Sequence, residues 1–481
     1  MTLIDLYSIL PAATLIVWAL FLLLANFWFS KRQPVWTPIL AGAGLLASLV
    51  VSIFFTGKPM AGFGGFILVD GFSNFLTPLF AVTGIFAIGL AYDYLRRMGI
   101  QRGEYYTLLL FSISGMMLMA SAGDLIIVFL ALELLSIPLY VLSGFAHPRV
   151  DSQESALKYF LLGTFASGFF LFGTSLVFGA ARTTNLTDIL AIVSSGEADT
   201  MLLLIGSALM LAGFGFKIAA VPFHSWTPDV YQGAPSPVAA FMSVGAKAAG
   251  FAALIRVFSM IFPSLAAELT PIFWALAALT MVVGNVVAIA QTNLKRMLAY
   301  SSIAHAGYLL MAFVPFGDAV TRSNSVASAL FYLTVYALAS LGAWAVLIGM
   351  EGEDNQGTEI SDLAGLGKTS PLSAAAMTVF MLSFTGIPLT LGFWGKFYLF
   401  RTAIEGGFVT LAVIGLITSL ASAFYYLRVV VKMYFQEGQP EFHWNFWTSS
   451  VAIFTALALV VFSFMPGSLF DLALRSMLTG S

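Results

Sequence analysis

Four ionisable residues interrupt long apolar runs of this 481-residue chain. Glu133 lies within the run Leu125–Leu142, and Lys217, Lys247 and Lys396 lie within three later runs. An ionisable side chain at the centre of a bilayer costs roughly 2.5–3.5 kcal/mol on insertion scales, and such residues typically mark functional sites. The structural alternative is that each forms a buried ion pair that joins two helices. One Glu cannot pair with three Lys, so the excess of buried Lys favours a proton relay.

The chemistry of a buried lysine supports this interpretation. Loss of water disfavours the ammonium, whereas a nearby carboxylate favours it, so the two influences together allow proton exchange near neutral pH. Helix-breaking residues lie beside two of the lysines: Pro222 follows Lys217, and Pro388 precedes Lys396 between two glycines. Broken helices expose backbone polar groups at membrane depth and are typical of transport sites in inverted-repeat proteins. Two ordinary proline kinks are the alternative.

Four further residues are candidates for a proton pathway. His224 follows the first predicted break, and His305 lies in the middle of an apolar run. Histidine titrates near neutral pH and passes protons through either ring nitrogen, although a neutral imidazole bonded to a backbone carbonyl is the alternative. Lys158 and Lys295 lie at span ends, where snorkelling to lipid headgroups competes with a role in a cytoplasmic proton uptake route.

The composition requires a membrane protein. Apolar residues make up 59% of the chain and charged residues 9%, against roughly a quarter charged in soluble proteins. The 21 Lys and Arg and 23 Asp and Glu cannot cover a soluble core of this size. Beyond the four residues deep in spans, we expect the charged residues in loops or near span ends.

The net charge and the cysteine count limit the cofactors and partners that this chain can have. The net charge of −2 with mixed signs gives no sign of a nucleic-acid partner, and the absence of Cys excludes disulfides and thiolate-bound clusters or zinc. No phosphate loop, dinucleotide fingerprint, metal cluster or nucleophile elbow is present. The N-terminus lacks the pattern of a cleaved signal peptide.

Apolar blocks of about twenty residues predict an all-α polytopic membrane protein with about fourteen transmembrane helices. Continuous runs of this length exclude β-barrel strands. The acidic stretch Glu351–Lys368 is expected to be a surface loop. The predicted spans are 5–27, 37–56, 72–92, 106–122, 125–145, 156–180, 201–220, 238–262, 272–292, 297–316, 326–350, 372–400, 408–433 and 448–466.

The distribution of basic residues predicts the orientation, because cytoplasmic loops carry the excess. Loops after odd-numbered spans hold twelve, and the other side holds six, which places both termini outside the cytoplasm. The twelve are Lys31, Arg32, Arg96, Arg97, Arg102, Arg149, Lys158, Lys295, Arg296, Lys368, Arg428 and Lys432, and the six are Lys58, Arg182, Arg256, Arg322, Arg401 and Arg475.

Three segments of the sequence resemble the antiporter-like subunits of respiratory complex I. The segment Lys217–Lys247 (KIAAVPFHSWTPDVYQGAPSPVAAFMSVGAK) carries a specific family signature, and its DVYQGAPSPV portion resembles the N type, the counterpart of mitochondrial subunit 2. The segments 291–308 (QTNLKRMLAYSSIAHAGY) and 386–397 (GIPLTLGFWGKF) match the same family. The resemblance covers essentially the whole chain.

The resemblance implies one membrane domain over 1–481 with fourteen helices, of which the seventh and twelfth are broken. Its parts would be helices 1–3 over 1–104, inverted five-helix repeats over 105–262 and 270–435, and a last helix over 436–481. The family's key glutamate on the fifth helix matches Glu133, and its lysines on the seventh, eighth and twelfth helices match Lys217, Lys247 and Lys396. Within the repeats, Glu133 would correspond to His305, and Lys217 to Lys396.

The resemblance further implies a proton-translocating subunit of NADH:quinone oxidoreductase in the bacterial inner membrane. NADH, FMN, iron–sulfur clusters and quinone would belong to partner subunits, with no cofactor in this chain. The expected neighbours are an M-type antiporter-like subunit and small K-type and J-type subunits, in contact with the lipid bilayer.

We expect Glu133 to pair with Lys217 and a change in the neighbouring subunit to open that pair. The proton would then move through Lys247 and His305 toward Lys396 and the outside. A subunit of a multi-subunit sodium/proton antiporter or of a membrane-bound hydrogenase would share most of these features. The non-transport alternative is an assembly scaffold whose buried charges only pair helices.

Overall fold

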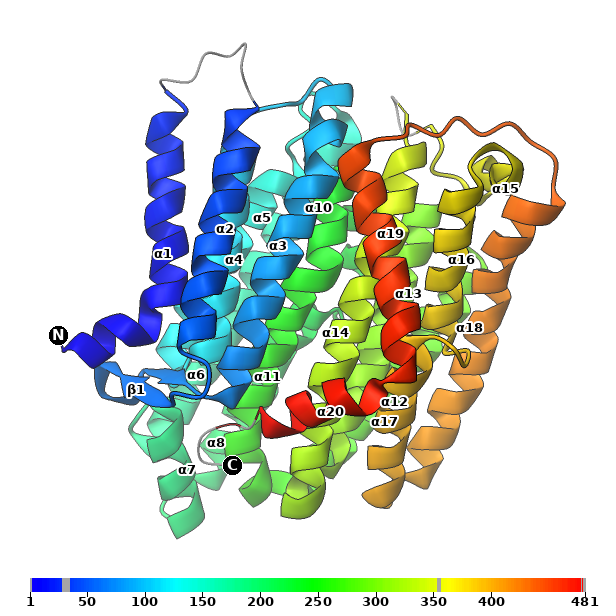
Figure 1. Cartoon of the computed structure of the whole chain (residues 1–481). Coiled ribbons are helices and arrows are strands. Elements are labelled where there is room, and N and C mark those ends of the chain that lie inside the picture. Colours follow the sequence, from blue (N-terminus) through cyan, green and yellow to red (C-terminus); the bar gives the residue numbers. More distant parts are fainter. Residues whose placement is uncertain (1, 28–34, 353–355, 477, 479–481) are drawn as a thin grey trace.

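The computed structural model describes residues 2–27, 35–352, 356–476 and 478. Most helices run side by side in one bundle (Figure 1). The first half contains α1 (Leu3–Ala25), α2 (Trp36–Phe54), α3 (Gly71–Arg97), α4 (Glu104–Ser121), α5 (Leu125–Ser143), α6 (Val150–Ala181), α7 (Leu186–Ser195), α8 (Thr200–Ile218), α9 (Trp226–Gly233), α10 (Ser236–Phe241), the π-helical turn η2 (Met242–Ala246) and α11 (Lys247–Ile261).

The second half repeats the pattern of long helices. It contains α12 (Ala266–Ile289), α13 (Leu294–Leu310), the 3₁₀ turn η4 (Met311–Gly317), α14 (Ala319–Met350), α15 (Leu366–Thr369), α16 (Pro371–Thr385), α17 (Leu391–Glu405), α18 (Val409–Phe435), α19 (Phe446–Val461) and α20 (Pro466–Arg475). Further 3₁₀ turns are η1 (Phe63–Gly65), η3 (Phe262–Leu265), η6 (Ile360–Leu363) and η7 (Phe462–Phe464).

The predicted all-α multi-pass fold is confirmed. Twelve helices in the described part of the chain are long and apolar enough to cross a membrane. Two predicted spans are not among these twelve. The span 106–122 corresponds to α4, which packs against α1, α3 and α5, and the span 372–400 is divided into α16 and α17. The count of fourteen crossings therefore stays a prediction.

Both predicted interruptions coincide with helix ends. Helix α8 ends at Ile218, where Ala219 adopts a left-handed φ of 61°, and α9 begins at Trp226. Helix α16 ends at Thr385, where Gly386 has a φ of 85°, and α17 begins at Leu391. Glycine adopts this conformation without steric cost, which explains why the second helix stops there.

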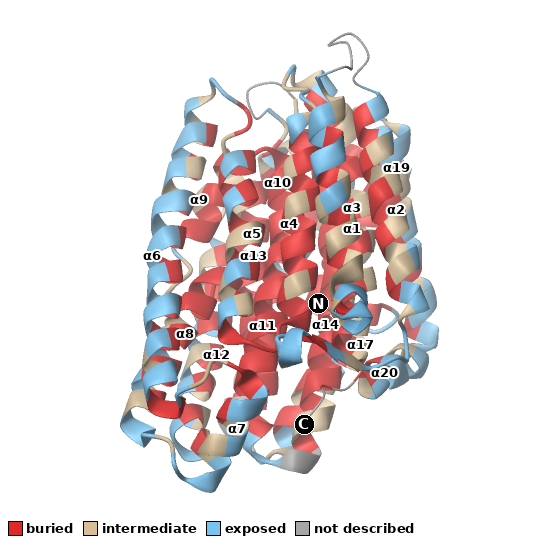
Figure 2. Cartoon of the chain, turned by 90° about the vertical axis from the view of Figure 1, so that its left-hand side faces the viewer, coloured by how far each residue is buried: buried red, intermediate tan, exposed pale blue. Residues whose placement is uncertain are grey.

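Burial separates a central row of helices from the periphery. All of the apolar window in Ser236–Ser259 is buried, as is 94% of that in Leu294–Gly317 and 89% of that in Thr321–Met350, against 28% in α1. Figure 2 shows α11, α13 and α14 buried inside the bundle, with α6 exposed at one edge. The central helices therefore carry whatever chemistry is shielded from lipid.

Three short features, a β-hairpin and two helices, are among those that were not predicted from the sequence. Strands β1 (Met60–Gly62) and β2 (Ile67–Val69) form an antiparallel hairpin with Met60 opposite Val69. The short helix α7 follows α6, and α20 lies across the long helices in the lower part of the view (Figure 1). All three are too short for the twenty-residue pattern on which the span prediction depended.

Lys31 and Arg32, which were counted for the orientation, lie outside the described residues. The expectation that Glu351–Lys368 is a surface loop is wrong in part, because Glu351, Thr358, Ile360, Leu363 and Leu366 are buried. The segment contains η6 and α15 and pairs Glu359 with Asn293 in a β-bridge, so it packs against the bundle.

Candidate functional site: a buried row of lysines and a histidine

The first lysine lies at the end of α8, beside the first helix interruption. Lys217 Nζ donates hydrogen bonds to Ser136 Oγ at 2.7 Å and to Tyr159 OH at 3.2 Å, and it lies 5.5 Å from the centre of the Tyr159 ring. Both partners are buried. The ammonium is thus held by two hydroxyl groups from α5 and α6.

Glu133 lies on α5, one turn before Ser136, and is partly exposed. Ser167 Oγ on α6 donates a hydrogen bond of 2.5 Å to Glu133 Oε1. The expected direct pairing with Lys217 is absent from the ion pairs of the described residues. Ser136, on the same helix, takes the contact with the ammonium instead.

The second lysine directly follows the π-helical turn η2. Lys247 Nζ donates to the carbonyl oxygen of Ser302 at 2.6 Å and also contacts the Ser302 hydroxyl. A π turn inserts one residue and occurs frequently at functional sites.

Gly250, one turn after Lys247, leaves room for the side chain of Lys217, because a Cβ built at Gly250 would lie 3.3 Å from Lys217 Cγ.

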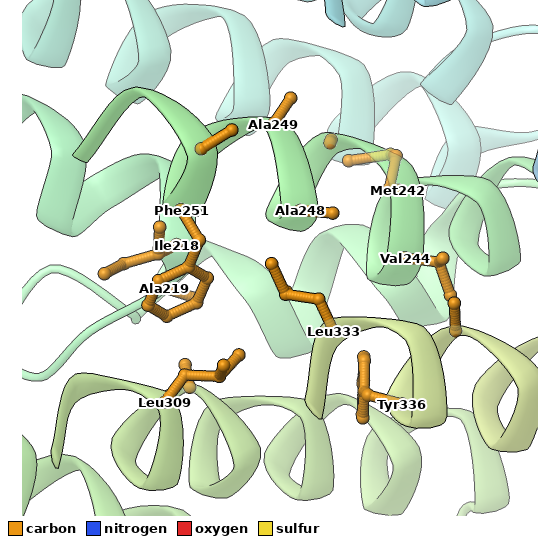
Figure 3. Packing of buried hydrophobic residues seen from close by; sticks show 14 of the residues in the cluster. Ile218, Ala219, Met242, Val244, Ala248, Ala249, Phe251, Leu309, Leu333 and Tyr336 are labelled. Carbon is orange, nitrogen blue, oxygen red and sulfur yellow. The ribbon is translucent and has the colours of Figure 1, made fainter. Parts of the chain in front are cut away.

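Buried apolar residues make up much of the η2–α11 segment that carries Lys247. Figure 3 shows Met242, Val244 and Ala248 on the η2–α11 segment near Leu333 and Tyr336, with Ile218, Ala219 and Leu309 close by. These residues are buried. In such surroundings a lone ammonium is expensive unless hydrogen-bonded, so the Ser302 contact is essential to hold it.

His305 lies between two tyrosines. Its Nδ1 is 2.6 Å from Tyr332 OH on α14, and its Nε2 is 3.1 Å from Tyr426 OH on α18. Tyr426 OH also contacts Ser301 Oγ, which neighbours the lysine partner Ser302. A cavity of about 10 Å³ beside the ring, lined by His305, Tyr332 and Ser383 among others, holds one water at most.

The third lysine follows the second interruption. Lys396 Nζ donates to Ser419 Oγ on α18 at 2.6 Å and to the Thr385 carbonyl at 3.0 Å, and it lies 4.7 Å from the centre of the Tyr308 ring. Thr385 is the last residue of α16, so its carbonyl has no partner within the helix. The break therefore supplies the acceptor for the ammonium.

The remaining pathway candidates differ in their surroundings. His224 lies in the break after α8, is partly exposed, and its Nδ1 has no hydrogen-bond partner among the described residues. Lys158 forms ion pairs with Glu154 and Asp229, both at 2.7 Å, and 40% of its side chain is exposed. No hydrogen bond between described side chains connects either residue directly to the three buried lysines.

Lys295 is buried, so the snorkelling interpretation is wrong for this residue. Its Nζ lies 3.5 Å from Glu351 Oε1 and donates to the Ala234 carbonyl at 3.1 Å. The acidic loop after α14 and the chain between α9 and α10 cover this end of α13. Contacts of this range cannot be read from the local sequence.

Sequence reasoning also missed a second buried ion pair. Arg256 was counted as a loop residue, but it lies in α11 with no exposed side chain, and its guanidinium binds Asp70 through bonds of 3.0 and 2.9 Å. Its Nε donates to the Ala120 carbonyl at 2.8 Å. The pair joins α11 to the start of α3 and the end of α4, and both charges are fully partnered. The sequence signal for this pair was the position of Arg256, a charged residue inside the predicted span 238–262.

Comparisons with known proteins match this architecture. The family model for the transmembrane part of NADH:quinone oxidoreductase and Mrp antiporters matches residues 122–422. The subunit N of NADH-quinone oxidoreductase from Chloroflexus aggregans is 44% identical over 98% of this chain and 97% of its own length. The corresponding subunit from Trichlorobacter lovleyi is 46% identical over 96% and 94%.

The chain belongs to the subunit N family of NADH-quinone oxidoreductase. A solved chain of Thermus thermophilus respiratory complex I aligns with a TM-score of 0.84 and 36% identity over 96% of this chain and 99% of that one. A chain of the Mrp complex from a Dietzia species has a TM-score of 0.87 at 18% identity, covering 99% of this chain and 97% of that one, which shows a shared fold. The resemblance predicted from the sequence, including the N type, is confirmed.

Proposed function

We propose that this chain moves protons across the membrane through Glu133, Lys217, Lys247, His305 and Lys396. As a member of the subunit N family, it is a membrane subunit of NADH-quinone oxidoreductase. The observation that carries the proposal is the placement of Lys247 and His305 in the most buried helices, each with polar partners. Buried ionisable groups of this kind typically form proton relays in membrane proteins.

The contacts supply two parts of a route between the buried groups, and these parts meet at the neighbouring residues Ser301 and Ser302 of α13. Lys247 binds Ser302, and the adjacent Ser301 contacts Tyr426, which in turn lies beside His305. Hydroxyl groups both donate and accept, so a proton can pass along them when their hydrogen bonds reverse. His305 then hands the proton toward Lys396 by way of either ring nitrogen.

Glu133 is the coupling residue in this proposal. It is partly exposed on a face of α5 that also carries Leu130 and Ile137, which are 55% and 56% exposed. A carboxylate on an apolar face of a membrane helix needs a partner there. A neighbouring subunit would cover this face and change the field at Lys217 through Ser136.

The energies involved are of similar size. Moving one charge against ~180 mV takes about 4 kcal/mol. Removing the partner of a buried charge costs about 3–5 kcal/mol. The free energy released when one contact of a buried lysine rearranges is therefore large enough to move one proton across the membrane.

The chain is a multi-pass membrane protein and part of a multi-subunit membrane complex. We place it in the bacterial inner membrane with both termini outside the cytoplasm, on the distribution of basic residues. The proposed neighbours are an M-type antiporter-like subunit and the small K-type and J-type subunits. NADH, FMN, iron–sulfur clusters and quinone would bind in partner subunits.

The test uses the whole complex in sealed vesicles. Lys247→Met keeps the length of the side chain but removes the proton-binding group, and we expect NADH-driven proton transport to fall by at least about 10²-fold. Lys432→Met is the matched control, because Lys432 is partly exposed and its ammonium donates a hydrogen bond to the side chain of Gln436, one turn later on the chain. Full transport by an assembled Lys247→Met complex would show that the buried lysine has only a structural role. Transport that depends on sodium would favour the antiporter alternative.

A further inference from the structure

A second cluster of buried ionisable groups lies outside the row of lysines. Glu351 caps the end of α14 with no exposed surface. Its Oε1 accepts a hydrogen bond from Tyr94 OH on α3 at 3.1 Å and lies 3.5 Å from Lys295 Nζ on α13. Three helices far apart in sequence thus meet at one carboxylate.

The carboxylate is only half satisfied. Glu351 Oε2 is buried and has no hydrogen-bond partner among the described residues. An unsatisfied buried oxygen on a charged group is costly, and a lock between helices would be more stable with both oxygens bonded. The Arg256–Asp70 pair shows what such a lock looks like here, since both of its carboxylate oxygens are bonded.

A polar cavity lies next to this cluster. It measures about 220 Å³ and is lined by Asp151, Glu154, Ser155, Lys158, Asp229, Gln232, Gly233 and Arg296. Gly233 forms part of its wall, and the next residue, Ala234, accepts the hydrogen bond from Lys295 Nζ. The cavity has room for several waters, and the hydrogen-bond partner of Lys295 directly follows a wall residue of this cavity in the chain.

Other charged groups surround the cluster. Arg97 donates to the Ile348 carbonyl at 2.6 Å, and Arg149 binds Asp151, a wall residue of the cavity, at 2.6 Å. Both arginines act electrostatically on Glu351. Together with Tyr94 and Lys295, they are the titratable and charged groups that the described residues place around this carboxylate.

We propose that Glu351 is a proton-accepting residue that receives protons entering by way of the cavity and passes them to Lys295, although it is not itself a wall residue of the cavity. The inference rests on the proposed function and adds an uptake site to it. The cavity lies at the end of the bundle that the basic residues predict to be cytoplasmic.

The transfer balances in two steps. A proton that has entered by way of the cavity binds Glu351 Oε2 and neutralises the carboxylate, and Lys295 then loses its anionic partner and releases a proton toward the interior. Glu351 next passes its own proton to the neutral Lys295 Nζ, which restores the ion pair. One proton enters from the cavity and one leaves inward in each cycle.

The inner acceptor lies along α13. Ser302 is seven residues after Lys295, on the same face of the helix. Ser302 is also the partner of Lys247. Two turns of α13 therefore separate Lys295 from the partner of Lys247.

The test compares two substitutions in the whole complex. Glu351→Gln keeps the size and hydrogen-bonding capacity of the side chain but removes the carboxyl group that binds the proton. Glu351→Asp keeps the carboxyl group on a shorter side chain. We expect Gln to slow NADH-driven proton transport by about 10²-fold, and Asp to retain more activity than Gln. A structural role predicts the opposite order. The control is Glu405→Gln, because Glu405 is 37% exposed and paired with Arg401 at the helix surface.

Infrared difference spectra recorded over a pH series give a second readout. We expect a carboxyl band that Glu351→Gln removes and that Tyr94→Phe shifts, because that variant removes only the hydroxyl donor. Transport by Glu351→Gln equal to that of Glu405→Gln, or an unchanged carboxyl band in both variants, would overturn the inference. If Lys247→Met abolishes transport while Glu351→Gln transports normally, the uptake site is wrong and the proposed function stands.

Discussion

Lys217 Nζ donates a hydrogen bond of 2.7 Å to Ser136 Oγ, and this hydroxyl lies one helical turn after Glu133 on α5. The hydroxyl itself donates to the Leu132 carbonyl at 2.5 Å. Ser136 therefore presents a lone pair to the ammonium at a fixed position. A shift of α5 that moves Glu133 also moves the acceptor of Lys217.

The Ser136→Ala variant should weaken proton transport without preventing assembly. A hydrogen bond to a charged group contributes about 1.5–3 kcal/mol, which corresponds to roughly ten- to hundredfold in an equilibrium constant. We expect NADH-driven transport by the whole complex in vesicles to fall by about tenfold or more. Ser143→Ala is the control, because Ser143 makes the same backbone contact on α5 without touching a lysine. Equal rates for the two variants would exclude a role of Ser136.

The lysines of the row could be predicted because each interrupts a long apolar run, and such interruptions are visible in the sequence. The residues that contact these lysines could not be predicted. Ser136 and Tyr159 are ordinary residues of buried helices, and only the packing of α5, α6 and α8 brings them to Lys217. The ion pair expected between Glu133 and Lys217 is absent from the described residues for the same reason. No spacing within one sequence gives the rotation of α5 against α8.

The Tyr426→Phe variant tests whether the hydroxyl between Ser301 and His305 conducts protons. The substitution removes one oxygen and keeps the buried ring, so the cost in stability should stay near 0.5–1.5 kcal/mol. We expect transport to fall by at least about tenfold, measured as NADH-driven acidification by the whole complex. Tyr106→Phe is the matched control, because Tyr106 is buried and its hydroxyl has no partner among the described residues. If both variants transport at the same rate, the route does not pass through Tyr426.

Span positions could be predicted to within about seven residues at each end, because the hydrophobic thickness of a bilayer sets the length of each apolar block, although the span 372–400 proved to be two helices. The burial of charged residues at the ends of spans was harder to predict. Lys295 and Glu351 both lie next to polar loops, so the sequence favours exposure, and only the folding of residues 351–368 against α13 buries them. Local hydropathy contains no information on such long-range coverage.

The Gly392→Ala variant should disrupt the second helix interruption. A Cβ added at Gly392 would overlap the carbonyl oxygen of Ser383, so α16 and α17 must separate at the point that positions Lys396. Overpacking of this kind costs about 1–3 kcal/mol. We expect reduced transport and a lower melting temperature of the purified complex. Gly168→Ala is the control, because a Cβ there meets nothing within 4 Å, and similar behaviour of the two variants would contradict the close approach.

The Arg256–Asp70 pair should stabilise the subunit without conducting protons. Removing one partner leaves a buried charge and typically costs about 3–5 kcal/mol, whereas replacing both by apolar residues is often neutral. Arg256→Met and Asp70→Leu should each reduce the amount of assembled complex in membranes, and the double variant should restore it. Transport per assembled complex should stay unchanged in all three, which separates this pair from Lys247. If the double variant assembles but transports no protons, the Arg256–Asp70 pair is part of the proton pathway and its assignment as a helix lock is wrong.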